Sequence, residues 1–179
     1  VKAQTLGMRS QGTLSLTSAV LSGALTANAV GAATLGPVSA GSVDVTAQSL
    51  VAGALTGGPV TLTATGGDMS LASVAASTLV ASATGRLSAT GQLSLSDAGT
   101  SANPALRLTG GSLALAQTRS VTARLTATNG DAGLGTQEIG SLWATATGAV
   151  TSGAITGQGG VPGGSVDVAG GTVALGDVK

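Results

Sequence analysis

Several residue types are missing from this 179-residue chain, which contains no Cys, no His, no Phe and no Tyr, and only one Trp. Without Cys, a disulfide, a reactive thiolate and a Cys-based zinc site are excluded. Without His, a Ser-His-Asp triad, a His-liganded metal and an imidazole acid or base are excluded. One aromatic residue is too few for the base-stacking surfaces of nucleic-acid binders or for the usual aromatic anchors of protein interfaces.

Charge is also scarce, because Lys and Arg number 7, Asp and Glu number 7, and together they make up 8% of the chain. A net charge of zero provides no basic patch of the kind that drives nucleic-acid binding. Ordinary globular domains have about a quarter of their residues charged, and disordered chains combine low hydrophobicity with high charge. With 42% hydrophobic residues and 30 Gly, this chain fits neither class.

Long hydrophobic runs are absent too. A membrane-spanning helix needs about 20 mostly apolar residues in succession, whereas Ser, Thr or Gly interrupts every apolar run here after a few residues. The stretch from Leu14 to Leu35 follows Lys2 and Arg9 as the core of a secretory signal would, but it is interrupted in the same way. We therefore expect strands in this stretch and no membrane insertion.

What the sequence does contain is a short pattern with alternating aliphatic residues: Gly, one further residue, an aliphatic, any residue, and a second aliphatic. Alternation with period 2 predicts β-strands, and the leading Gly predicts a turn before each one. The pattern occurs at residues 12–16, 41–45, 58–62, 67–71, 91–95, 111–115, 164–168 and 171–175.

A second motif sets the length of the repeat. Residues 63–66 read TATG, residues 82–85 read SATG, and we align residues 101–104, SANP, as a third copy at the same interval. Residues 126–129 and 145–148, TATN and TATG, are separated by that interval again. The repeat length is therefore about 19 to 20 residues, with an insertion between Ala105 and Val121. The chain then holds about nine repeats.

Repeats of this length, made of short strands and Gly turns, predict an all-β fold in which each repeat is one coil of a β-solenoid. The aliphatic every six residues that left-handed hexapeptide solenoids need is missing, so we expect a right-handed parallel β-helix with three short strands per coil. We expect residues 1–179 to form one solenoid segment of a longer repetitive chain. The predicted inward ladder consists of Leu14, Leu16, Val43, Val45, Val60, Leu62, Leu93, Leu95, Leu113, Leu115, Val166 and Val168.

The run of G-x-L-x-L strands, the Ala- and Thr-rich second strands and the length of the repeat resemble the large repetitive exoproteins of the filamentous haemagglutinin type, and autotransporter passengers are similar. The resemblance covers the whole chain. It implies a β-helical stalk on the outside of a Gram-negative-type envelope, with a role in adhesion, matrix formation or toxin delivery. The N-terminal secretion domain of that family is not recognisable in this chain.

We therefore expect a structural stalk or fibre segment of a secreted cell-surface adhesin or extracellular filament. It would be no enzyme, with no catalytic or metal site and no cofactor. Its expected partners are the continuing chain or further copies stacked end to end, with host or cell-surface glycans or proteins, and no nucleic acid. Two alternatives stay open: a β-helical carbohydrate-binding or polysaccharide-degrading protein, and an ice-binding solenoid.

Few residues qualify as a functional site. Asp68, Arg86 and Arg107 are about one coil apart and could line one face, as in polysaccharide-degrading β-helices. Solvated turns explain them better, because the paired carboxylates of glycoside hydrolysis are missing. Asp44 and Asp167 occupy the same place in two GSVDV copies, where alternation predicts that both point outward. They are too few for a calcium site and are best explained by solubility.

The remaining candidates are threonines, the single Trp and two polar segments. Thr-x-Thr arrays could form an ice-binding face, although the alignment places no Thr in the 101–104 copy. Trp143 could stack on a sugar, but we expect it to pack at a corner or beside an insertion. Residues 97–104 and 128–138 are predicted to be loops that leave the column, the usual place for a binding feature. The arrays are Thr61, Thr63 and Thr65; Thr126 and Thr128; and Thr145 and Thr147.

Overall fold

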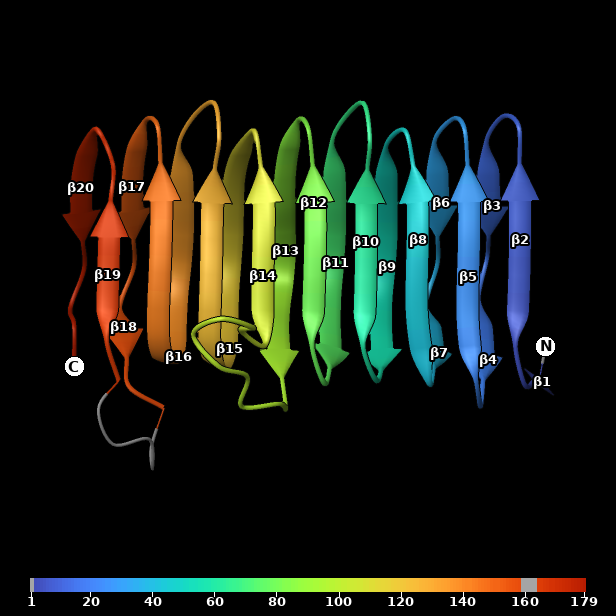
Figure 1. The fold of residues 1–179 in the computed structure, drawn as a ribbon, viewed down its shortest axis with the longest axis horizontal. Helices are drawn as coiled ribbons and strands as arrows, with labels where there is room; N and C mark the ends of the chain where they lie inside the picture. Colours follow the sequence, from blue (N-terminus) through green and yellow to red (C-terminus); the bar gives the residue numbers. More distant parts are fainter. Residues whose placement is uncertain (1, 159–163) are drawn as a thin grey trace.

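The computed structural model describes residues 2–158 and 164–179, and these form strands and turns with no helix. All strand pairs are parallel, and the chain winds into a column of about nine coils. In Figure 1 the near strands point upward, the chain returns behind them, and successive coils advance from the N-terminus toward the C-terminus. This sense of winding makes the column a right-handed parallel β-helix, as predicted.

Each coil contributes strands to three faces. The near layer of Figure 1 is the first face, and each coil is counted from its strand in this layer. Its strands are β2 (Leu6–Ser10), β5 (Ala24–Ala29), β8 (Ser42–Ala47), β10 (Val60–Ala64), β12 (Leu79–Ala83), β14 (Leu106–Gly110), the last part of β15 (Ser112–Ala127), the last part of β16 (Ala132–Ala146) and β19 (Val166–Ala169).

The second and third faces form the far layer, the second in its upper half and the third in its lower half. The second face holds β3 (Leu14–Leu16), β6 (Ala33–Leu35), the first parts of β9 (Leu50–Gly57), β11 (Met69–Ala76), β13 (Arg86–Leu95), β15 and β16, then β17 (Ala149–Ser152) and β20 (Thr172–Leu175). The third face holds β1 (Lys2–Ala3), β4 (Ala19–Leu21), β7 (Val38–Ala40), the later parts of β9, β11 and β13, the middle parts of β15 and β16, and β18 (Ile155–Thr156).

The core is a set of aliphatic columns inside the coils, because alternate residues of each strand point inward. Of the twelve predicted inward residues, nine are buried. Leu16 and Val168 are partly buried, and Val166 is 40% exposed. Val166 and Val168 keep the inward register opposite Leu142 and Ala144, but they belong to β19, which pairs on one side only among the described residues.

The coils are less regular in length than predicted, although the intervals from Thr63 to Ser82 and from Thr126 to Thr145 are confirmed. On the first face Leu25 pairs with Val43, and Val43 pairs with Val60, so the interval between stacked partners shrinks by one position from one coil to the next. Both intervals are shorter than the period that the sequence motifs indicated. The register of the coils therefore drifts along the chain instead of following one fixed repeat.

One coil is much longer than its neighbours. Leu79 pairs with Leu106, which is the widest interval on the first face among the described residues. The extra residues therefore lie before Leu106. The predicted insertion between Ala105 and Val121 is wrong, because β14 and β15 occupy that segment.

The two predicted loops have different outcomes. Residues 97–104 do leave the column and contain no strand. Residues 128–138 do not, because β16 starts at Ala132 and continues through Glu138. The segment stays in the column because Ala132 and Leu134 fill inward positions that alternate with outward Gly133 and Gly135. Most of its polar side chains lie on the outer side of the column, and Gln137 is the buried exception.

No helix of the described residues is long and apolar enough to cross a membrane.

Candidate functional site

The three residues proposed as a polysaccharide-degrading cluster do not come together. Asp68 and Arg86 occupy one corner of neighbouring coils, where Oδ1 of Asp68 accepts a hydrogen bond from the backbone N–H of Arg86 at 2.8 Å. Arg107 lies on the first face, in β14, opposite Val80 of β12. The idea that all three line one face is therefore wrong. The carboxylate of Asp68 instead accepts a hydrogen bond from the backbone of the next coil.

The same corner is built a second time in the column. Oδ1 of Asp131 accepts a hydrogen bond from the backbone N–H of Ala149 at 2.7 Å. In both places the residue just before the donor is a Gly, Gly85 or Gly148, and a Cβ added there would collide with the Asp carboxylate. Each of these two carboxylates therefore joins its coil to the next by one hydrogen bond, and each needs a glycine beside it.

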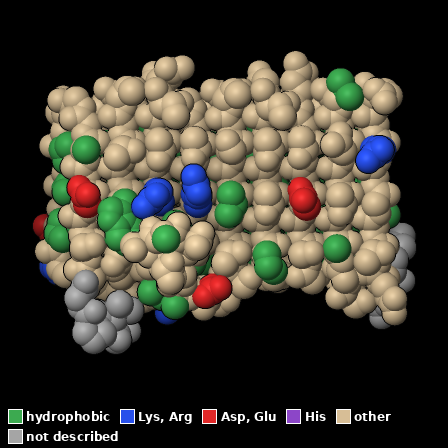
Figure 2. All heavy atoms as spheres, viewed as in Figure 1, with side chains coloured by type: hydrophobic (Ala, Val, Ile, Leu, Met, Phe, Trp, Pro, Cys, Tyr) green, Lys and Arg blue, Asp and Glu red, His purple; other side chains and the backbone are tan. Residues whose placement is uncertain are grey.

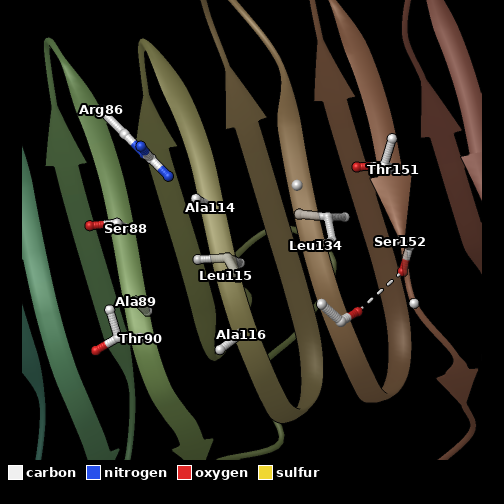
Figure 3. Close-up of a pocket in the computed structure, with 13 residues that line it drawn as sticks. Arg86, Ser88, Ala89, Thr90, Ala114, Leu115, Ala116, Leu134, Thr151 and Ser152 are labelled. Atoms are coloured by element: carbon white, nitrogen blue, oxygen red, sulfur yellow. Dashed lines mark hydrogen bonds between the residues drawn. The ribbon is translucent and has the colours of Figure 1, made fainter.

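The second face carries a wide, shallow depression of about 600 Å³ across β13, β15, β16 and β17 (Figure 3). Its floor is formed by short side chains and backbone, including Ala114, Gly133 and Gly135. Arg86 is the one charged residue that lines it, and Ser152 Oγ donates to the backbone carbonyl of Gly135 at 3.5 Å. It is hollow because its outward residues are small, and it offers no cluster of reactive groups.

The richest chemistry lies in one outward-facing row on the first face, where residues of successive coils are backbone partners. Figure 2 shows the row running along the long axis of the molecule, with both signs of charge on a face that is mostly uncharged. In order from the third coil, the row is Asp44, Thr61, Val80, Arg107, Arg124, Trp143 and Asp167. Asp44 and Asp167 are exposed in this row, as predicted.

Three consecutive members of this row, Arg107, Arg124 and Trp143, form what we call the Arg–Trp ladder. Arg107 is exposed, whereas Arg124 and Trp143 are partly exposed. Trp143 lies in the middle of a strand, between the buried residues Leu142 and Ala144. Trp143 therefore does not lie at a corner, which was one of its two expected placements. Its ring points outward because it occupies an outward position of the alternation.

The loop formed by residues 97–105 lies across the base of the first face at β14 and β15 (Figure 1). The buried Thr122 anchors it, because its Oγ1 donates to the carbonyl of Ala98 at 2.8 Å and accepts from the N–H of Ala105 at 2.9 Å. Nη2 of Arg124 donates to the carbonyl of Ser101 at 3.1 Å. The loop is thus fixed beside the ladder. Gly99 has a φ of 60°, in the left-handed region that a glycine adopts easily, and this allows the tight turn of the loop.

A pocket of about 300 Å³ separates this loop from the column. The loop provides Asp97, Gly99, Asn103 and Pro104, and the column provides Thr78, Val80 and Arg107. Arg107 thus belongs both to the pocket and to the ladder. No sequence spacing indicated this juxtaposition, because it depends on which residues leave the column.

A second outward row on the first face is made of hydroxyl residues. It runs through six consecutive coils as Thr46, Thr63, Ser82, Thr109, Thr126 and Thr145. The sequence alignment placed residues 101–104 in this row and is wrong, because Thr109 is the backbone partner of both Ser82 and Thr126. The hydroxyl row is therefore more continuous than the sequence indicated.

Among the described residues, no three Asp or Glu side chains gather closely enough to hold a metal ion. The ion pair that these residues form joins Arg119 and Glu138, partners in β15 and β16, with Nε and Oε1 3.4 Å apart. Both side chains are about half exposed, so this pair contributes little to stability. No protein-family model, no curated protein and no solved structure matches the chain.

Proposed function

We propose that this chain is a stalk or fibre segment of a secreted cell-surface adhesin or extracellular filament, and that it acts by structure rather than by catalysis. The observation that supports this most is the in-register parallel pairing of strands through successive coils. Each coil presents the same backbone edge as the coil before it, so further coils can be added to the column by the same strand pairing. A column built in this way is an elongated rod, which is the shape that a stalk requires.

We propose that the column is extended at its C-terminal coil. Val166, Val173 and Leu175 are 40%, 44% and 38% exposed, and β19 and β20 each pair on one side among the described residues. An unpaired strand edge with apolar side chains is a template for further strand pairing. We propose that this edge is covered either by continuing chain or by another copy stacked end to end.

The proposed location is outside the cell, on a Gram-negative-type envelope. The resemblance to repetitive exoproteins supports it, and the absence of Cys and His in the sequence is compatible with a structural role there. Antibodies raised against this chain should label intact cells, and added protease should remove the label. Labelling that requires permeabilised cells would contradict the location.

Electron microscopy of the natural material, with averaging along the fibre axis, tests the stalk. We expect a continuous rod with an axial repeat of about 4.8 Å, the spacing of paired strands. The length of the larger repeat separates one long chain from stacked copies. Compact particles without the strand repeat would refute the stalk.

The hydroxyl row favours ice binding as a second candidate function. Its six Ser and Thr side chains are spaced at the strand separation, and Thr65 and Thr128 beside it each donate from Oγ1 to a carbonyl of the preceding coil at 3.2 Å. A regular array of hydroxyl and methyl groups is the feature an ice surface would match. Thermal hysteresis that Thr63→Lys and Thr126→Lys abolish would support this function, and no hysteresis at millimolar protein would exclude it.

A further inference from the structure

We propose that the Arg–Trp ladder binds an anionic polysaccharide. Arg107 and Arg124 would hold acidic groups of the glycan, and Trp143 would stack on a sugar ring. This site does not depend on the stalk proposal, because it uses outward side chains that the column does not need for its own pairing.

The first argument is the placement of two cations on adjacent coils. Arg107 and Arg124 are direct backbone partners in β14 and β15, where like charges repel. The whole chain has only 7 basic residues, so side-by-side placement of two is notable. Within residues 2–158 and 164–179, neither guanidinium has a carboxylate within 4.0 Å. A bound anion would remove the repulsion.

The second argument is geometric. Arg107, Arg124 and Trp143 follow one another at the strand spacing of about 4.8 Å, in a straight row. This spacing is close to the length of one sugar unit in an extended chain, so successive sugars can meet successive members of the ladder. Arg presents a planar fork that matches carboxylate or sulfate, and the face of an indole ring suits the apolar face of a pyranose.

The third argument is that Arg124, the central member of the ladder, is held in place before any ligand binds. Arg124 is tied to the carbonyl of Ser101, which uses one of its five N–H donors and leaves the others for an anion. The 97–105 loop is in turn anchored by Thr122. Because a fixed site loses less conformational entropy on binding, this arrangement favours recognition.

The pocket beside the loop indicates where the glycan would extend. Asp97 lines this pocket together with Arg107, and its Oδ1 accepts from the N–H of Gly99 at 3.2 Å. The carboxylate of Asp97 would repel an acidic group of the glycan in the pocket, but it can accept hydrogen bonds from sugar hydroxyls. We infer that acidic groups lie over Arg107 and Arg124, and that neutral hydroxyls enter the pocket.

The test uses the fluorescence of Trp143, which is the only Trp in a chain without Tyr or Phe. The protein is titrated with polygalacturonate, dextran sulfate and neutral dextran, and calorimetry measures the same affinities independently. We expect a saturable fluorescence change with an anionic polymer, weakened by added salt. Tighter binding of polygalacturonate identifies a carboxylate ligand, and tighter binding of dextran sulfate identifies a sulfate ligand.

Four variants assign the binding to the ladder. Arg107→Gln and Arg124→Gln should each weaken the affinity by about tenfold or more, since each removes a charged hydrogen-bond donor. Trp143→Leu, followed by calorimetry, should weaken binding while keeping its salt dependence. The control is Arg86→Gln, which removes an exposed Arg from a different face.

Circular dichroism should show the same strand content in all four variants, because every changed side chain points outward. Three outcomes would overturn the proposal: no binding of either anionic polymer, equal binding of neutral dextran, or an equal loss of affinity in Arg86→Gln. A rod that forms normally but binds no glycan would refute this site and leave the stalk proposal intact.

Discussion

The inward ladder can be tested at a single pair of neighbouring residues. Leu93 in β13 is fully buried, and its backbone partners are Val74 in the preceding coil and Thr118 in the next. Leu93→Ala removes most of a buried side chain and leaves a cavity, and substitutions of this kind cost about 2–5 kcal/mol. Strands on both sides limit how far the site can collapse, so we expect about 3 kcal/mol or more. Leu93→Asp buries an unpaired charge and should cost more still.

The matched control is the adjacent residue, Ser94, which lies on the outer side of the same strand and is partly exposed. Ser94→Ala should change the free energy of unfolding by no more than about 0.5 kcal/mol. Urea titrations followed by far-ultraviolet circular dichroism measure both variants. Fluorescence of Trp143 serves as a second probe, because long repeat arrays can unfold in parts rather than in one step.

The reasoning would be refuted if Ser94→Ala and Leu93→Ala had the same effect on stability. That result would mean that the strand does not present alternate residues to the core. A large change in the denaturant slope for Leu93→Ala alone would point instead to partial unfolding of the coils next to β13.

Three further changes test details of the column. Asp68→Ala should lower the free energy of unfolding by about 1 kcal/mol, because it removes the acceptor for the N–H of Arg86, whereas Asp68→Asn should keep most of that stability. Gly85→Ala should lower stability even with Asp68 present, because the added Cβ would collide with the carboxylate. Thermal unfolding measures all three variants. Thr122→Val should destabilise by about 1–3 kcal/mol and speed hydrogen exchange at the Ala105 amide, since it leaves that buried N–H unpaired. Gln137→Leu should leave stability unchanged or raise it by about 1 kcal/mol, because Oε1 of Gln137 is buried without a partner; a clear loss in a urea titration would contradict this.

Local patterns were enough to predict the strands, because each depends on alternation along a few residues. Val43, Val45, Leu93 and Leu95 are buried as expected, and Asp44 points outward between its two valines. The small, aliphatic composition also fits the narrow interior of the column, since side chains from three faces must share it. These properties are fixed within a single coil and need no knowledge of its neighbours.

The alignment of one coil on another was predicted less well. The sequence motifs indicated one fixed period, whereas stacked partners such as Leu25 and Val43, or Val43 and Val60, lie closer together in the chain. The 101–104 segment looked like a further TATG copy, but it lies in the loop and Thr109 takes its place in the column. Short repeats of Ala, Thr, Ser and Gly match one another at several offsets, so similarity alone does not identify the stacked partner.

The sequence by itself determined that this chain forms short parallel strands with an aliphatic interior and that it contains no Cys and no His. Only the tertiary structure placed Arg107, Arg124 and Trp143 in one row. The 97–105 loop lengthens one coil, so that Arg107 lies over Val80, and the next two coils return to the ordinary length. Which side chains become neighbours on a solenoid depends on the number of residues in every coil between them. That number follows from the hydrogen bonds between coils, which form only in the folded column.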